Sequence, residues 1–219
     1  IAAFVVKYIS DGLNGVSDLL KRIVQWKVKW IWYVVVIIIP VLLVIVAGYF
    51  DELINKQSFT MNGFSTNNEF PEFGFISYFL FNLFTFGIGE ETGWRGYALP
   101  ALQKRFTALT ATLILAVGWA CWHIPAFIYR PLYSQMNITG IAGFFISMLM
   151  GAIVLTWLYN STKGSLLIVA IFHAMIELMF MSSNITVKMS SYLGATIMIA
   201  AVLIILIAKR GNLSLQLKQ

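Results

Sequence analysis

Long apolar segments separated by shorter polar ones dominate this chain. Six of them reach or approach the roughly 20 residues that a helix needs to cross a bilayer. Their ranges are 30–50, 73 to 89 and beyond, 107–129, 140–159, 164–181 and 191–208. The longest polar stretch, 51–72, separates the first two and predicts a loop. We therefore expect an all-α fold, a polytopic transmembrane helical bundle with about six spanning helices.

The pattern differs between residues 7 and 29. Apolar residues there recur at helical spacing beside charged ones: Val16, Leu19, Leu20, Ile23 and Val24. This predicts an N-terminal amphipathic helix lying in the membrane interface. The chain begins at Ile1 without a methionine, and residues 1–6 resemble the end of an earlier apolar segment. We expect upstream helices to precede a single membrane-embedded domain, 1–219.

Composition supports the membrane class. The chain is 59% hydrophobic and 11% charged, whereas soluble domains carry about 25% charged residues. The net charge is +6, and the basic residues are unevenly distributed along the chain. If the six segments cross the membrane in alternating directions, twelve of the 15 Lys and Arg residues lie on one side, and Lys56, Arg130 and Lys188 lie on the other. Positive loops face the cytoplasm. We predict an integral plasma-membrane protein with both ends cytoplasmic, in contact with the lipid bilayer and with no nucleic-acid partner.

Three charged residues stand in the middle of this apolar chain: Glu90, Glu91 and Arg95. Each ionised group costs about 2.5–3.5 kcal/mol at bilayer depth on insertion scales, so their presence there indicates function. Residues four apart share a helix face, so Glu91 is predicted to pair with Arg95. Glu90 is rotated by about 100° and is left for chemistry. The alternative is a salt-bridge cluster at a helix end.

The two histidines lie in different apolar segments. His123 follows Trp119 by four residues, so the indole can wall a pocket around the imidazole, and Pro125 is predicted to bend or end the helix. His173 precedes Glu177 by four residues and shares its face. The structural alternative for His123 is an interhelical hydrogen bond. For His173 it is a local hydrogen bond to Glu177 that fixes one tautomer.

The acidic motif and the two histidines can meet only if they lie at a similar depth in the bilayer. Apolar residues continue past the acidic motif up to Lys104, which places the glutamates near the middle of a longer, broken or tilted helix. Gly93, Gly96 and Pro100 supply irregularity, which is tolerated where the backbone lines a cavity. We therefore expect the acidic motif and both histidines to gather around one water-accessible hollow.

Two imidazoles and two carboxylates favour hydrolysis by one of two routes. They can bind a divalent metal, most simply zinc held by Glu90, His123, His173 and Glu177, with a water in an open position. Without a metal, a glutamate acts as general base while the histidines orient water and stabilise an oxyanion. The sequence contains neither a His-Glu-x-x-His motif nor a Gly-x-Ser-x-Gly elbow. The cofactor prediction is thus none or a divalent metal.

Three motifs in separate segments together resemble the CPBP family, the CAAX-protease and bacteriocin-processing endopeptidases, also called the Abi or type II CAAX prenyl endopeptidase group. The family pattern is Glu-Glu-x-x-x-Arg, aromatic-x-x-x-His and His-x-x-x-Asn or Asp. The matching residues here are Glu90, Glu91 and Arg95; Trp119 and His123; His173 and Glu177.

The resemblance implies peptide-bond hydrolysis within the membrane, on a membrane-associated peptide or protein. It implies that Glu90 activates water together with His123, and that His173 binds the water or stabilises the oxyanion. Glu91 and Arg95 would hold the architecture of the site. Glu177 departs from the usual Asn or Asp, and an ionised Glu cannot donate a hydrogen bond. It would be a protonated donor, an orienting partner of the second histidine, or a metal ligand.

Two other functions fit a membrane protein with buried acids and histidines. A proton- or ion-coupled transporter uses such groups as relays, although transporters usually show repeats and this chain shows none. A non-catalytic bacteriocin-immunity protein would keep the fold without the chemistry. The intramembrane endopeptidase is the leading prediction.

Overall fold

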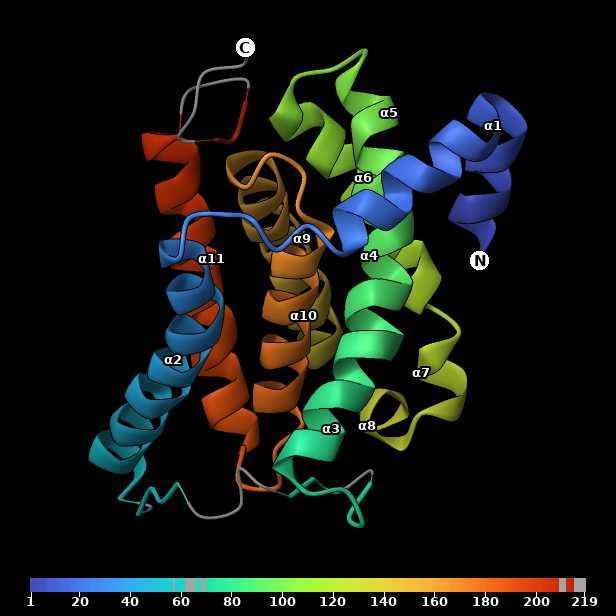
Figure 1. The fold of residues 1–219 in the computed structure, drawn as a ribbon. Helices are drawn as coiled ribbons and strands as arrows, with labels where there is room; N and C mark the ends of the chain where they lie inside the picture. The colour runs from blue at the N-terminus through green and yellow to red at the C-terminus, as the bar shows by residue number, and fades with distance from the viewer. Residues whose placement is uncertain (57, 62–65, 68–69, 209–211, 215–219) are drawn as a thin grey trace.

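The computed structural model describes residues 1–56, 58–61, 66–67, 70–208 and 212–214 (Figure 1). The α-helices are α1 (Ala2–Ile23), α2 (Ile31–Asn55), α3 (Phe75–Asn82), α4 (Gly89–Gly93), α5 (Leu99–Gln103), α6 (Ala108–His123), α7 (Ala126–Tyr129), α8 (Pro131–Ser134), α9 (Ile138–Ser161), α10 (Leu166–Phe180) and α11 (Val187–Ile207). Two π-helical segments, η1 (Leu83–Ile88) and η2 (Trp94–Ala98), flank α4. The predicted all-α bundle is confirmed.

Four helices in the described part of the chain are long and apolar enough to cross a membrane. They cover Ile31–Asn55, Ala108–Tyr129, Ile138–Ser161 and Lys188–Ile207. The other two predicted spans carry the acidic motif and His173. The acidic segment is broken by its π-helical turns, and α10 has 15 residues, about 22 Å at 1.5 Å per residue, against a hydrocarbon core of about 30 Å.

Helix α10 can be short because protein covers it. It packs against α2, α3, η1, α4 and α9, and ten of its 15 residues are buried. Figure 1 shows it in the middle of the bundle, with α2 and α11 to one side and α3 and α4 to the other. A residue on this helix is therefore surrounded by other helices on most of its sides.

The acidic motif lies within a helical segment that continues from Phe75 to Gln103. This confirms the predicted long, irregular helix with the glutamates near its middle. The irregularity takes the form of two π-helical segments, which are rare and frequently found at functional sites. Gly96 lies in η2 as expected, whereas nothing in the sequence pattern had indicated η1.

Helix α1 covers most of the segment predicted as an amphipathic helix, 7–29, with different bounds. It begins at Ala2 and ends at Ile23, so residues 24–30 form a linker instead of the predicted last turns. Gly12 kinks it with φ +62°, a conformation that glycine adopts at little cost. After the kink, α1 runs across the bundle (Figure 1).

The charges used to predict orientation are only partly described. Lys209, Arg210 and Lys218 lie outside the described residues. Lys188 donates to Asn55, the residue before Lys56, at 2.6 Å, so two lysines assigned to the same side do lie at one end of the bundle. The cytoplasmic placement of both ends stays a prediction.

Candidate functional site

Glu91 and Arg95 form the predicted ion pair. Arg95 Nη1 donates to the two carboxylate oxygens at 2.8 and 3.0 Å, and both side chains are fully buried. The Arg95 guanidinium also lies 4.8 Å above the Trp119 ring. Buried charges require a partner, and each of these two has one. Arg95 therefore belongs to the interior of the site and not to the cytoplasmic loop charges among which the orientation prediction counted it.

Glu90 points elsewhere, as the helix geometry predicted. It is half-buried, and its Oε2 accepts a hydrogen bond from Trp119 Nε1 at 2.8 Å. The spacing of Trp119 and His123 predicted the indole as a wall beside the imidazole, and this bond was not predicted. The signal was present, because a buried indole N–H usually finds an acceptor.

Trp119 is the centre of the site. Its ring centroid is 5.6 Å from that of His123 and 5.7 Å from that of His173, both in edge-on arrangements. Glu90, bonded to the same indole, brings in the third helical segment. The predicted convergence of the acidic motif and both histidines is thus seen around a single ring.

Hydrogen bonds fix the orientation of both imidazoles. His123 Nδ1 lies 2.9 Å from the Trp119 carbonyl oxygen, and His173 Nδ1 lies 2.7 Å from Glu91 Oε1. A carbonyl and a carboxylate oxygen only accept, so each Nδ1 carries the hydrogen. Each Nε2 is consequently the nitrogen left for a water or a substrate.

Glu177 does not orient His173 in this arrangement. His173 Nε2 and Glu177 Oε1 are 4.0 Å apart, too far for a hydrogen bond. The orienting carboxylate is Glu91, which bonds the other ring nitrogen. The Glu177 side chain is 30% exposed, so it lies at the open side of the site, close enough to share a bridging water with the imidazole.

The donor set does not form a ready metal site. Across the described residues, no three His, Cys, Asp or Glu side chains are grouped so as to hold a metal ion. Both Nδ1 atoms are already bonded to protein oxygens. The zinc set of Glu90, His123, His173 and Glu177 therefore stays a prediction.

Gly87 is a functional position that the sequence analysis missed. A Cβ atom placed there would lie 2.6 Å from the Ala170 carbonyl oxygen, so η1 and α10 meet backbone to backbone. Ala170 precedes His173 by three residues, and Gly87 precedes Glu91 by four. The close approach therefore sets the distance across which Glu91 bonds the imidazole.

Replacing Gly87 with Ala should force η1 and α10 apart. We expect a loss of about 1–3 kcal/mol in unfolding free energy from overpacking, together with a longer contact between Glu91 and His173. Gly93→Ala is the matched control, because a Cβ there meets nothing within 4 Å; it should be neutral or stabilising by up to about 1 kcal/mol. Denaturant unfolding in mixed micelles measures both, and equal effects of the two variants would contradict the argument.

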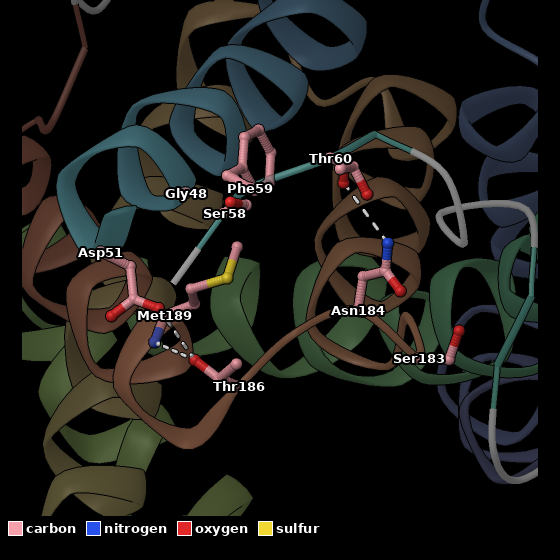
Figure 2. A pocket seen from close by; sticks show the side chains of 9 residues that line it. All are labelled: Gly48, Asp51, Ser58, Phe59, Thr60, Ser183, Asn184, Thr186 and Met189. Carbon is pink, nitrogen blue, oxygen red and sulfur yellow. Dashed lines mark hydrogen bonds between the residues drawn. The ribbon is translucent and has the colours of Figure 1, made fainter. Parts of the chain in front are cut away.

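A separate cavity lies away from these residues. Figure 2 shows it between the end of α2, residues 58–60 and the connection from α10 to α11. Asp51, Asn184 and Thr186 contribute to its polar lining, and Lys188 lies next to Met189, another lining residue. None of the predicted site residues borders it, so the cavity is no part of the arrangement around Trp119.

The fold and site together define a polytopic membrane protein with a partly buried glutamate–histidine centre. Residues 72–179, which contain every predicted site residue, match the family described as Type II CAAX prenyl endopeptidase Rce1-like. A curated relative from Methanococcus maripaludis, named CAAX prenyl protease 2, is 33% identical over 103 residues. That match covers 45% of this chain and 38% of the relative, so it spans about two fifths of the relative's length. Residues 72–179 of this chain belong to the CPBP family.

Proposed function

We propose that this chain is an intramembrane endopeptidase, which hydrolyses a peptide bond of a membrane-associated peptide or protein with water activated by Glu90. One observation carries the proposal. Trp119 donates to Glu90 and packs against His123 and His173, so that a carboxylate and two imidazoles from three helical segments surround one ring. The description of the family and the name of the Methanococcus maripaludis relative support the same activity.

Glu90 is the group that takes the proton from water. Its Oε2 is bonded to the Trp119 indole, and its Oε1 remains to accept from a water molecule. Neutral His123, with its hydrogen on Nδ1, can accept the second water hydrogen at Nε2. The water oxygen then attacks the carbonyl carbon, forming the new C–O bond while its proton passes to Glu90.

His173 is placed to stabilise the oxyanion that results. In its protonated form the ring donates from Nε2 to the oxyanion, while Glu91 at 2.7 Å balances its charge from the Nδ1 side. The proton on Glu90 next moves to the leaving nitrogen as the C–N bond breaks. The products are a free carboxyl end and a free amine, and Glu90 returns to a carboxylate.

Glu91 and Arg95 act through position. Arg95 Nη1 binds both Glu91 oxygens, and Glu91 in turn holds His173. Because these groups are buried, the pair keeps the imidazole at one orientation throughout the reaction. This differs from the role of Glu90, whose half-buried side chain can reach water.

The proposal is tested by cleavage. Purified protein in liposomes is incubated with a library of membrane-anchored peptides, and products are identified by mass spectrometry. Discrete products with new amino termini are expected from wild type. A folded protein that cleaves no member of a broad library, while supporting proton-linked flux across the same vesicles, would favour the transporter alternative instead.

Replacing Glu177 with Gln should preserve most of the cleavage rate, to within about threefold, if Glu177 serves as a protonated donor, since a glutamine amide also donates. The rate is measured with zinc content determined on the same preparation, before and after chelation. An inactive variant that has also lost zinc present in the wild type would make Glu177 a metal ligand and would replace the metal-free route.

A further inference from the structure

The last turn of α1 and the linker to α2 together form an exposed surface with basic and aromatic side chains. We call this the linker surface and define it as Lys21, Lys27, Lys29, Trp26 and Trp30. Trp26 is 64% exposed and Trp30 is 73% exposed, and Lys27 Nζ lies 5.6 Å from the Trp26 ring. The sequence has no acidic residue between positions 18 and 51, so little neighbouring negative charge offsets these lysines.

The position of this surface relative to the bilayer follows from α2. Helix α2 begins at Ile31, directly after the linker, and is long and apolar enough to cross a membrane. Tryptophans that flank a spanning helix lie at the level of the lipid head groups. Trp26 and Trp30 therefore place the linker lysines beside lipid phosphates, where basic residues are attracted to anionic lipid.

The linker is also bonded to the helices that carry the site. The Gln25 carbonyl oxygen accepts from Ser165 Oγ at 2.8 Å, and Gln25 Nε2 donates to the Thr162 carbonyl at 3.3 Å. Arg22 Nη1 donates to the Tyr159 hydroxyl at 2.7 Å. Thr162 and Ser165 connect α9 to α10, the helix of His173, so the linker surface is fastened to the base of that helix.

Helix α1 closes over the turn that carries Arg95. Leu19 is completely buried. A Cβ atom at Gly96 would lie 3.0 Å from Leu19 Cδ2 and 3.1 Å from Leu166 Cδ1. Leu19 thus fills the space between the start of α10 and η2 at Gly96, the residue that follows Arg95. Helix α1 also contacts α4, which carries Glu91.

We propose that the linker surface binds anionic phospholipid head groups, and that the bound lipid holds α1 against η2 and α10. The activity of the site then depends on anionic lipid, a consequence that rests on the proposed endopeptidase function. The binding itself does not. The observations that carry it are the exposed lysines and tryptophans at the start of a spanning helix and the bonds from Gln25 to the site helices.

Lipid binding is tested with a charge-matched pair of variants. One carries Lys21→Gln, Lys27→Gln and Lys29→Gln; the control carries Lys104→Gln, Arg105→Gln and Lys163→Gln, three exposed basic residues outside the linker surface. Native mass spectrometry measures phosphatidylglycerol bound against phosphatidylcholine. Each lysine near an anionic surface strengthens binding by a factor of about five. The affinity of the linker variant for phosphatidylglycerol should therefore be roughly a hundredfold lower than that of the wild type. Equal loss in both variants would overturn the proposal.

Coupling to the site is measured without any substrate. Adding phosphatidylglycerol should slow hydrogen exchange of the amides in residues 13–23 in the wild type and the control, and not in the linker variant. Leu19→Ala should keep lipid binding but lose this slowing. Unchanged exchange in the wild type would overturn the coupling. Cleavage rates across the same lipid mixtures then follow the exchange, whereas absence of cleavage in every mixture would count against the endopeptidase function alone.

Discussion

Replacing Glu90 with Gln should abolish peptide hydrolysis while leaving the fold in place. The amide oxygen of Gln can still accept from Trp119 Nε1, so the hydrogen bond to the indole survives. The amide cannot take a proton from water, and loss of a general base lowers rates by roughly 10²–10⁴-fold. Cleavage of a membrane-anchored peptide in liposomes measures the rate. The unfolding free energy of the variant should stay within about 1 kcal/mol of the wild-type value.

Glu52→Gln is the matched control for this variant. Glu52 is another half-buried glutamate, and its Oε2 accepts the Phe59 backbone N–H at 3.3 Å, a bond that Gln can keep. Glu52 lies at the opposite end of α2 from the linker, so its replacement should leave the cleavage rate unchanged. A Glu90→Gln protein with wild-type cleavage would remove Glu90 from the chemistry, and a retained biological effect without cleavage would favour the immunity-protein alternative.

Breaking the Glu91–Arg95 pair should have the largest effect on stability. Arg95→Met leaves a fully buried carboxylate without its partner, and removing one member of a buried pair costs about 3–5 kcal/mol. Glu91→Leu should cost a similar amount, because Arg95 Nε and Nη2 already have no hydrogen-bond partner among the described residues. Unfolding free energies in mixed micelles measure both.

The double variant separates pairing from packing. With both charges replaced by apolar groups, much of the stability should return, so that the two single losses exceed the double loss by at least about 2 kcal/mol. Cleavage should not return, because His173 Nδ1 would have lost its acceptor. Additive single losses would mean that the two charges are not coupled.

Local spacing in the sequence predicted those parts of the site that lie within one helix. The four-residue separation of Glu91 and Arg95 predicted their bond, and the one-residue offset of Glu90 predicted that it points elsewhere. Pro125 correctly placed the end of α6 at His123. Contacts between helices were harder to predict. The spacing offered Glu177, on the same helix, as one possible orienting partner of His173, whereas the carboxylate that bonds the imidazole is Glu91.

Other features depend on three-dimensional packing that periodicity does not encode. The π-helical turns η1 and η2 change the phase of the acidic segment by inserting residues into the helical repeat. Trp119 could have been assigned its bond to Glu90 only by knowing that α6 and α4 face one another. The acidic segment and α10 differ from the other four predicted spans in regularity and length. The first is interrupted by π-helical turns, and the second has 15 residues, ten of them buried by neighbouring helices.

The backbone contact between Gly87 and Ala170 has a consequence for how a polypeptide can enter. With no side chain at Gly87 to yield, η1 cannot slide along α10 without driving backbone atoms together. These two segments should therefore move as one rigid body. Under the proposed function, the movement that admits a peptide would therefore involve α6, which carries Trp119 and His123 and is joined to Glu90 by the indole hydrogen bond.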